Sequence, residues 1–424
     1  MNKYYSNPST PPCDLGGLSK EVAGLNLEKI DGLLAQRAPG HGLPREFYTD
    51  PAIYDFDLAA IHARTWLLVG FDVELPRPGS YLSAMYGRWP ILITRDRSGR
   101  LSAFHNTCRH RGAQICEVGR GAAARLVCPY HAWTYELDGE LVGAPRMGDD
   151  FDRGKYGLLP IHVESLEGAI YICLAETPPP FDDFRAAFAP LLAPHRLHEA
   201  KLAFESTLIE NANWKLVMEN ARECYHCARR HPELARTFPV GASGHFDYGE
   251  DTSLDRFNDR MTSLGLPVGP VEGSWWQSMR FALNEGAVSM TTDGQPVVSR
   301  LMCETGEGDI GSLRWSNEPA SFCHATGDHL FMFSAQPLGP RETIVVAKWL
   351  VHKDAQEGVD YDIDRLSDLW TRTNLQDRDL VENNQRGVDS PAYLPGPYSH
   401  EAEALAIRFV DWYCATARDY IGSR

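Results

Sequence analysis

Two short motifs in the first third of the chain bring together side chains that bind metal. Cys108 and His110 are separated by one residue, and Cys128 and His131 are separated by two. Each motif is short enough for a tight loop to point its thiolate and its imidazole to the same side. Two sulfur and two nitrogen ligands are the set required by a [2Fe–2S] cluster in which two cysteines bind one iron and two histidines bind the other.

Zinc is the alternative occupant, because two cysteines and two histidines can also close a tetrahedron around one ion. Zinc sites usually pair cysteine with cysteine and histidine with histidine within each half of the motif. In this chain each half contributes one of each, which is expected when each loop reaches both irons. The arrangement therefore favours a Rieske-type [2Fe–2S] cluster over zinc.

A second group of acidic and histidine residues lies near the middle of the chain. Helical spacing would place Glu219, Glu223 and His226 on one face. His231 follows five residues after His226, and an ideal helix would rotate it by roughly 140° from that residue. Pro232 provides the bend that both histidines need to meet one metal, because a proline disfavours the α conformation of the residue before it. Two histidines and one carboxylate on one face of an iron are typical of non-haem Fe(II) oxygenases.

The spacing does not select the carboxylate ligand. Asp377, Asp379 and Glu382 fall within one charged helical segment, and any of them can turn toward the histidines. A solvated helix face is the usual place for most such residues. From the residues alone, all three therefore stay candidates.

The cysteines indicate a reducing compartment. The chain contains 10 cysteines, and its polar N-terminus has no apolar segment typical of a secretory signal. We therefore expect the cytoplasm, with thiols and metal ligands rather than disulfides. Cys224 and Cys227 have the spacing of a redox pair or a zinc half-site, but no second cysteine pair lies nearby at zinc spacing. We expect these two residues to be packed, inert thiols.

The net charge limits the possible partners. The chain has 41 basic and 57 acidic residues, which gives a formal net charge of −16. A nucleic-acid partner is disfavoured because phosphate binding requires a basic surface, whereas a cationic substrate is compatible with this charge. No apolar run approaches the ~20 residues that span a bilayer, so we expect no membrane partner.

The elements around the first two motifs are short. Helical spacing predicts one helix over 20–35 and another over 57–66. Asp138-Gly139 is a hairpin turn signal directly after the second metal loop. Alternating apolar segments separated by glycine and proline predict a small antiparallel β domain, with strands at 67–73, 79–85, 91–95, 101–105, 126–129, 133–137 and 170–174.

The second half of the chain mixes both kinds of element. Apolar periodicity predicts helices around 181–192, 210–228, 360–386 and 400–420, and strands at 286–292, 298–303, 330–336 and 343–351. Helices packed at one side of an antiparallel sheet define an α+β domain. The run from Thr177 to Pro180 is the strongest break in composition. We divide the chain into an N-terminal arm and helix (1–40), a small antiparallel β domain (41–165) and a larger α+β domain (166–424).

Together these motifs resemble the large (alpha) subunit of Rieske non-haem iron oxygenases, over nearly the whole chain. Within that family the chain looks most like the group of glycine betaine monooxygenase and stachydrine demethylase, which acts on quaternary ammonium compounds. The resemblance implies a helix-grip catalytic domain beside a Rieske domain. It rests on segments that begin at Phe104 (FHNTCRHRG), Cys128 (CPYHAWTYELDG), Asn213 (NWKLVMENARECYH), Lys348 (KWLVHKDA), Gln385 (QRGVDS) and Pro395 (PGPYS).

The resemblance also implies roles for single residues. His226, His231 and Asp377 match the ligands of the family's mononuclear iron. Glu223 matches the acidic residue that links the two metal centres, and it would meet His131 of a neighbouring subunit in a ring, usually a trimer. A carboxylate between two ligand imidazoles holds both of them in the tautomer that binds metal.

The implied reaction uses O₂ and electrons from NAD(P)H. The chain has no nucleotide-binding fingerprint, so a separate reductase with flavin and iron–sulfur groups would supply the electrons. Hydroxylation of an N-methyl group would give an unstable hemiaminal, which releases formaldehyde and the demethylated amine. One alternative is the same architecture acting on carnitine or an aromatic ring. Another is an electron carrier without a mononuclear iron, which the length of the chain disfavours.

The sequence leaves the substrate-binding residues open. Aromatic faces are the best surface for a quaternary cation. A substrate carboxylate would require an arginine such as Arg280 or Arg314, and the sequence does not choose between them. The aromatic candidates, each more often a core residue than a binding residue, are Trp275, Trp276, Phe281, Trp315, Phe331 and Phe333.

Overall fold

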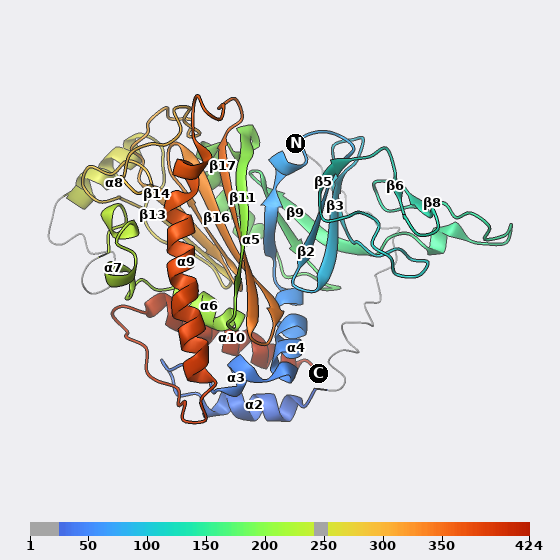
Figure 1. Ribbon diagram of the computed structural model, residues 1–424, viewed down its shortest axis with the longest axis horizontal. Coiled ribbons are helices and arrows are strands. Elements are labelled where there is room, and N and C mark those ends of the chain that lie inside the picture. The colour runs from blue at the N-terminus through green and yellow to red at the C-terminus, as the bar shows by residue number, and fades with distance from the viewer. Residues whose placement is uncertain (1–24, 241–252) are drawn as a thin grey trace.

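The computed structural model describes residues 25–240 and 253–424. The predicted N-terminal arm and the first part of the predicted helix 20–35 lie outside these residues. The rest of that helix is present as α2 (Leu27–Gln36), which buries one apolar face. The described chain forms two seven-stranded sheets, with a small third sheet at the outer end of the first (Figure 1).

The first sheet contains most strands of the predicted β domain, and all of its pairs are antiparallel. In β3, Ile91 and Ile93 pack in the main core of this sheet, whereas Leu92 packs with Cys108 and Cys128 on the other face. One face of the sheet therefore supports the metal-binding loops. In spatial order the strands are β1 (Leu67–Phe71), β10 (Ala169–Cys173), β9 (Pro160–Leu166), β4 (Leu101–His105), β3 (Trp89–Arg95), β2 (Ser80–Tyr86) and β5 (Gly119–Ala122).

The third sheet is a short hairpin extension made of β6 (Leu126–Val127), β7 (Thr134–Tyr135) and β8 (Leu141–Gly143). The predicted turn lies between β7 and β8, where Gly139 has a φ of +88°. A Cβ atom at this position would come within 2.5 Å of the Phe104 ring, so both the backbone and the available space require glycine.

The second sheet separates two cores, because successive side chains of a strand point to opposite faces. Phe331 of β16 enters the core that contains α9 (Ile363–Val388), while Leu330 and Met332 enter the core shared with the first sheet. The Phe331 ring stacks on Trp370 of α9 at 4.2 Å, so α9 lies across this sheet (Figure 1). In spatial order the strands are β11 (Ala200–Glu210), β17 (Glu342–His352), β16 (His329–Gly339), β15 (Ser321–Ala325), β14 (Ser312–Asn317), β13 (Trp276–Phe281) and β12 (Val271–Glu272).

The predicted C-terminal helices are confirmed as α9 and α10. The predicted helix 57–66 begins earlier than expected, because Asp50 caps α4 by accepting from Ala52 N and Pro51 fills the first helical position. It ends at Ala60 and is followed by a short 3₁₀ helix. The remaining helices are α3 (Glu46–Thr49), α4 (Pro51–Ala60), α5 (Asp182–Leu192), α6 (Trp214–Ala221), α7 (Cys227–Arg230), α8 (Ser253–Ser263) and α10 (Ala404–Gly422).

Two of the predicted strands are wrong, since residues 286–292 and 298–303 form irregular chain. The buried Asp328 carboxylate accepts hydrogen bonds from Val297 N at 2.9 Å and from Ser289 Oγ at 2.7 Å. This segment therefore satisfies polar groups with a side chain rather than with a neighbouring strand. Strands β13, β14 and β15, for which no strand was predicted, complete the sheet instead.

A buried ion-pair cluster joins the two large sheets. Lys348 of β17 donates to Glu74 at 2.9 Å, and Arg120 of β5 donates to the same carboxylate at 2.8 Å. Glu74 and Lys348 are both buried. Burial raises the pKa of Glu74, but the two cations more than offset this effect and the net shift is downward.

The predicted domain boundary after residue 165 stays a prediction. The first sheet extends beyond it through β10. The run from Thr177 to Pro180 then connects this strand to α5, where Phe188 packs against Trp276 of the second sheet. Among the helices of the described residues, none is long and apolar enough to cross a membrane.

Candidate metal centres

Two loops beside the first sheet hold the predicted cluster ligands. Cys108 and His110 lie in the loop after β4, and Cys128 and His131 lie between β6 and β7. Each loop is closed by a backbone hydrogen bond to its cysteine carbonyl, at 2.9 and 3.0 Å. Both cysteines are buried free thiols, and both histidines are partly exposed.

The geometry of these loops fits an iron shared by the two histidines. His110 Nδ1 and His131 Nδ1 are 3.1 Å apart. Two nitrogen atoms that bind one four-coordinate ion at ~2.1 Å are separated by ~3.0 Å at a right angle and by ~3.4 Å at the tetrahedral angle. Trp133 stacks on the His110 ring at 5.0 Å, and the Tyr135 hydroxyl lies 3.3 Å from Cys108 Sγ. These two aromatic neighbours were not singled out in the sequence, although both lie within the second predicted loop and strand.

Contrary to the prediction, Glu219, Glu223 and His226 do not share a helix face. α6 ends at Ala221, so Glu223 and His226 lie in the turn that leads to α7. Arg222 anchors this end of the helix, because its buried guanidinium forms an ion pair at 2.7 Å with a glutamate beside β14. The turn, rather than the helix, therefore places these two residues.

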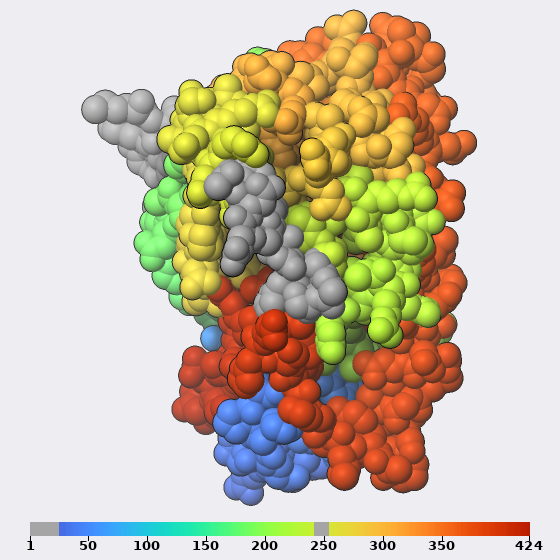
Figure 2. Space-filling model, turned by 90° about the vertical axis from the view of Figure 1, so that its left-hand side faces the viewer, coloured from blue at the N-terminus to red at the C-terminus, as the bar shows by residue number. Residues whose placement is uncertain are grey.

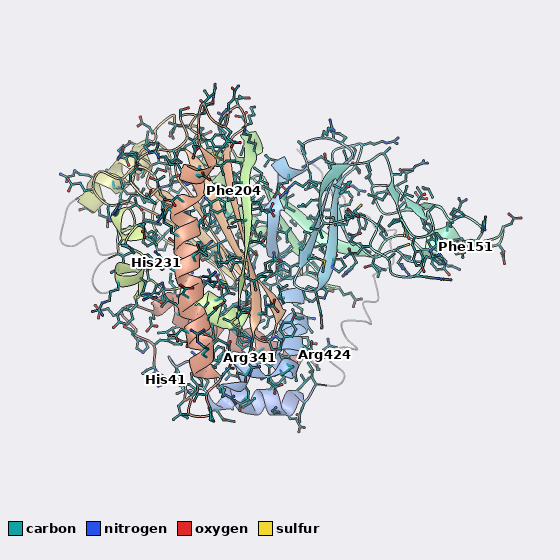
Figure 3. The ribbon with its side chains drawn as sticks, viewed as in Figure 1. His41, Phe151, Phe204, His231, Arg341 and Arg424 are labelled. Atoms are coloured by element: carbon teal, nitrogen blue, oxygen red, sulfur yellow. A yellow bond between two sulfur atoms is a disulfide. The ribbon has the colours of Figure 1, made fainter. Side chains whose placement is uncertain are left out.

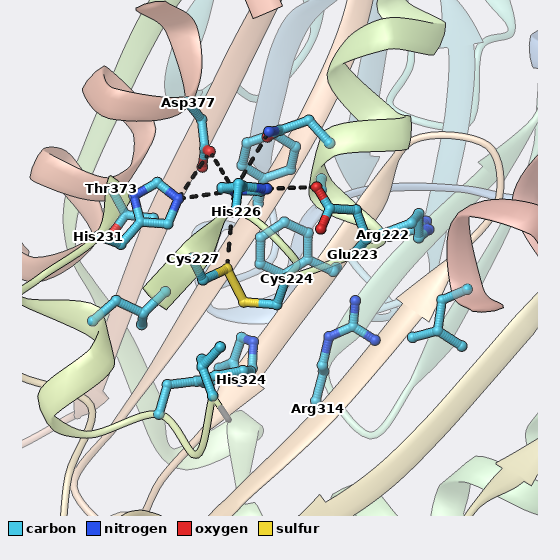
Figure 4. A pocket seen from close by; sticks show the side chains of 18 of the residues that line it. Arg222, Glu223, Cys224, His226, Cys227, His231, Arg314, His324, Thr373 and Asp377 are labelled. Atoms are coloured by element: carbon cyan, nitrogen blue, oxygen red, sulfur yellow. Dashed lines mark hydrogen bonds and ion pairs between the residues drawn. A yellow bond between two sulfur atoms is a disulfide. The ribbon is translucent and has the colours of Figure 1, made fainter. Parts of the chain in front are cut away.

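Three donor atoms meet beside this turn (Figure 4). His226 Nε2 and His231 Nε2 are 3.0 Å apart, and Asp377 Oδ1 lies 3.2 Å from the first and 3.0 Å from the second. His231 ends α7 with a ψ of 69°, outside the helical region, as predicted from Pro232. Donors at ~2.1 Å from one ion and at right angles are ~3.0 Å apart, so all three separations fit a single ion.

Asp377 is the acidic candidate that the structure brings to the histidines. Its Oδ1 atom is buried and accepts no well-directed hydrogen bond from the described residues, which is unfavourable for a carboxylate unless a cation binds there. Glu382 instead accepts from Asn211 N at 3.0 Å, and Asp379 forms an exposed pair with Arg378 at 3.0 Å.

Each imidazole of this triad is held through its other nitrogen. Glu223 Oε1 lies 2.5 Å from His226 Nδ1, and Gln376 Oε1 lies 2.7 Å from His231 Nδ1. The Gln376 amide nitrogen donates to Glu233 at 3.2 Å, which directs its oxygen toward the histidine. An amide oxygen only accepts, so His231 Nδ1 holds the proton and Nε2 is left as a ligand. The only sequence signal for Gln376 was its position directly before Asp377.

The carboxylates make His226 more basic than an ordinary histidine. Burial lowers the pKa of this imidazole, but Asp377 and Glu223 more than offset this effect and bring it to about 9. Burial raises the pKa of Asp377, yet the two imidazoles hold it below its usual value. The site therefore favours positive charge, and a metal ion that binds there must displace a proton.

Glu219 belongs to a separate network. It accepts hydrogen bonds from Tyr48 at 2.8 Å and from Tyr398 at 2.7 Å. Burial raises the pKa of Glu219 to about 7, although the two phenol hydrogen bonds lower it. This residue therefore ties α6 to distant segments and does not contact the donor triad.

Cys224 and Cys227 form a disulfide, which corrects the prediction of packed thiols. The tight turn between α6 and α7 brings their Cα atoms to 4.9 Å, within the range that disulfides bridge. Cys227 Sγ lies 3.9 Å from His226 Nε2 at the cavity wall (Figure 4), but a bonded sulfur is not a thiolate ligand. The other seven cysteines of the described residues are free, as predicted.

The donor triad opens into a cavity of about 290 Å³. On the face shown in Figure 2, the yellow-green chain around α7 lies near the red chain that leads into α10, and both contribute to the wall. Of the six aromatic residues that the sequence suggested for substrate binding, Phe333 lies in the cavity wall. Phe331 stacks on Trp370 and is separated from the cavity by that ring. The aromatic wall residues are Phe238, Phe322, Phe333 and Trp370.

The two groups of ligands lie on opposite sides of the molecule. In Figure 3, His231 lies beside α9, whereas Phe151 lies near the far tip of the molecule. Phe151 packs against Trp133 at 5.5 Å, and Trp133 stacks on His110, so the first ligand group belongs to that far end. Within one chain the two groups therefore do not form a common site.

Comparison with known families agrees with this architecture. Residues 65–164 match the Rieske [2Fe-2S] domain, and residues 195–418 match the catalytic domain of the ring hydroxylating alpha subunit. The chain belongs to the family of Rieske oxygenase alpha subunits. It is an O₂-dependent oxidoreductase, and its two domains imply a [2Fe–2S] cluster and a mononuclear iron.

Individual relatives show which members of this family the chain resembles in sequence. The glycine betaine monooxygenase oxygenase subunit of Chromohalobacter salexigens is 44% identical over 400 residues, 91% of this chain and 87% of the relative. That of Pseudomonas aeruginosa is 43% identical over 399 residues, 92% of each chain. The carnitine monooxygenase oxygenase subunit of Acinetobacter baumannii is 32% identical over 258 residues, 58% of this chain and 70% of the relative.

Solved structures share the fold at low sequence identity. A quaternary ammonium Rieske monooxygenase in complex with an inhibitor has a TM-score of 0.70 and 23% identity, and the match covers 91% of this chain and 98% of that one. Naphthalene 1,2-dioxygenase from Rhodococcus sp. has a TM-score of 0.65 and 19% identity, with 94% and 99% covered. These matches confirm the predicted α+β class.

Proposed function

We propose that this chain is the oxygenase component of a multicomponent system that hydroxylates an N-methyl group of a quaternary ammonium compound, glycine betaine or a close analogue. The main supporting observation is the convergence of His226, His231 and Asp377 beside an aromatic-walled cavity. The relatives with 43–44% identity, which are named as glycine betaine monooxygenase subunits, support the substrate class.

In this proposal the side chains have three tasks. The donor triad holds the iron, while Glu223 and Gln376 keep the two imidazoles in the required orientation. The aromatic wall holds the cationic end of the substrate. When bound, the cluster and the iron supply the electron transfer and O₂ activation that side chains cannot provide. The proposed ligands of the cluster are Cys108, His110, Cys128 and His131.

The proposed reaction consumes one O₂ and two electrons per methyl group, and NAD(P)H supplies the electrons through a separate flavin and iron–sulfur reductase. One oxygen atom enters a C–H bond of the N-methyl group, and the other leaves as water with two protons. The hemiaminal then loses its hydroxyl proton and its C–N bond breaks, with the electron pair returning to nitrogen. Formaldehyde and the tertiary amine are released.

We also propose that the chain assembles as a ring of three subunits in the cytoplasm, where NAD(P)H is available. The separation of the two ligand groups within one chain supports this assembly (Figure 3). Glu223 of one subunit would then contact His131 of its neighbour. Light scattering should give the mass of about three 47.4 kDa chains.

The test of the proposed function is a substrate panel with NADH and a surrogate reductase. Glycine betaine should yield formaldehyde and N,N-dimethylglycine in equal amounts. The Asp377→Ala variant, checked for intact cluster absorption, should yield neither and serves as the control. If carnitine or an aromatic compound were hydroxylated while every betaine gave no formaldehyde, the alternative of a carnitine-type or ring-hydroxylating oxygenase would replace the proposal.

A further inference from the structure

Strand alternation distinguishes the two arginines that the sequence left as equal candidates. Arg280 and Arg314 lie on the adjacent strands β13 and β14, but their side chains have opposite surroundings. Arg280 donates to His195 at 2.9 Å and to Ile310 O at 3.1 Å, away from the cavity. Arg314 pairs across the sheet with His324, and both line the cavity.

Arg314 forms no direct ion pair in the part of the chain that the structure describes. No described carboxylate forms an ion pair with its guanidinium, whose carbon lies 5.8 Å from the centre of the Phe322 ring. The other arginine of the cavity wall, Arg222, is paired with Glu318 at 2.7 Å. Burial, followed by repulsion from Arg222, lowers the pKa of Arg314 to about 9 although the Glu318 carboxylate raises it, so the group is still cationic at neutral pH.

Arg314 and the donor triad lie toward different ends of the cavity. In Figure 4 the disulfide lies between them, with His226 and Asp377 on one side and Arg314 and His324 on the other. The His324 ring lies 5.1 Å from Trp370, which precedes Asp377 by seven residues on α9. Seven residues correspond to about 10 Å along a helix.

Aromatic rings and a neutral imidazole lie in the wall near Arg314. The Phe322 and Phe333 rings stack at 4.7 Å. Burial, together with repulsion from Arg314, holds the pKa of His324 well below its usual value, so this imidazole is neutral. Unlike Arg222, which is paired with Glu318, Arg314 can therefore offer its positive charge to a ligand, while the rings beside it can contact methyl groups.

We propose that Arg314 binds the carboxylate of a zwitterionic betaine whose N-methyl groups face the donor triad, and that it thereby selects betaines over simple quaternary cations. The inference rests on the proposed function and names its substrate class. From a methyl carbon to a carboxylate oxygen, a betaine with one methylene spacer measures about 5 Å, and a hydrogen bond adds about 3 Å. Together they give about 8 Å, which is comparable with the ~10 Å of helix between Trp370, beside His324, and Asp377 of the donor triad.

The selectivity has an attractive and a repulsive part. An arginine fork can hold both oxygens of a carboxylate, and the partly buried site strengthens this contact. A cation without a carboxylate, such as choline, would meet an unneutralised guanidinium instead and would be disfavoured. The same residue therefore accepts the zwitterion and rejects the plain cation.

The test measures binding to the metal-loaded wild-type protein by calorimetry, using glycine betaine, its methyl ester and choline. The ester removes the carboxylate charge without changing the protein, and we expect its Kd to be at least about 30-fold higher, the usual cost of losing one partner of an enclosed charge pair. Arg314→Gln should raise the Kd of betaine by a similar factor and leave that of choline unchanged or lower. Arg314→Lys should recover part of the betaine affinity. Arg300→Gln removes an exposed arginine that pairs with Asp360, and it is the matched control.

Equal binding of betaine and its ester by the wild-type protein would overturn the inference, even if Arg314→Gln does not fold. An equal loss of betaine and choline binding in Arg314→Gln would assign the residue a structural role and would also overturn it. The proposed function is tested separately by formaldehyde release. A wild-type enzyme that demethylates betaine and choline equally well would retain the function and refute the role of Arg314.

Discussion

Replacing Gln376 should weaken iron binding at the mononuclear site without touching a ligand. Gln376 Oε1 accepts from His231 Nδ1 at 2.7 Å, and the His231 side chain is only 1% exposed. In Gln376→Leu the Nδ1–H would lose its acceptor in a buried place, and the ring would no longer be held in the tautomer that leaves Nε2 free. Loss of such a partner typically reduces metal affinity by about 10- to 100-fold, or about 1.4–2.8 kcal/mol.

The assay is competition for Fe(II) between the protein and a chromophoric chelator, with the cluster present and its visible absorption as a check of folding. Gln376→Glu keeps an acceptor at the same place and should bind iron at least as well as the wild type. Asp379→Asn alters an exposed residue of the same helix and should change nothing. An Fe(II) affinity of Gln376→Leu within twofold of the wild type would refute the reasoning.

Three further predictions concern neighbouring groups. Asp377→Ala should lower the iron content from about three to about two per chain while the cluster spectrum is retained. Loss of the cluster as well would contradict the prediction that the cluster and the mononuclear iron have separate sites. The pKa of Glu219 is about 7 in the folded chain and near its ordinary 4.5 when unfolded. The wild type should therefore lose up to about 3 kcal/mol of stability as pH rises from 4.5 to 7, because only the folded state holds the proton there. In Glu219→Gln the free energy of unfolding should not fall with pH in this way, which urea unfolding at pH 5 and 8 can measure. An equal pH dependence of stability in the wild type and the variant would refute this prediction. Replacing Cys224 and Cys227 together by serine should lower the free energy of unfolding by about 2 kcal/mol in the same assay, because the disulfide closes a very short loop in the unfolded chain. An unchanged urea midpoint would contradict this prediction and indicate that other contacts hold the turn.

The cluster ligands could be predicted from the sequence because the information is local. Each half of the site is one short loop, so residue spacing alone places Cys108 beside His110 and Cys128 beside His131. The donor triad is different. Asp377 is brought to the histidines by the face of α9 that meets α7. The residue types and their spacing did not indicate which acid turns inward, and only the family resemblance selected Asp377.

Strand β15, next to the cavity, was missed for a different reason. Every residue from Ser321 to Ala325 in β15 is buried, so the strand lacks the alternation of polar and apolar residues that marks a half-exposed strand. The irregular segment around Val298 was mistaken for a strand because its apolar side chains pack in the core, whereas its backbone N–H groups donate to the Asp328 carboxylate and not to a neighbouring strand. The Cys224 disulfide was missed because it depends on a turn that interrupts the predicted helix.

The Glu74 cluster limits how this chain can be divided. Its carboxylate is neutralised by Arg120 from the first sheet and by Lys348 from the second. Removing one partner of a buried pair costs about 3–5 kcal/mol. A fragment that stops before Thr177 would retain the acid without its lysine, and so would a chimaera that joins this electron-transfer half to a foreign catalytic half. Recombination between relatives, natural or engineered, should therefore succeed only where the acid and the lysine are inherited together.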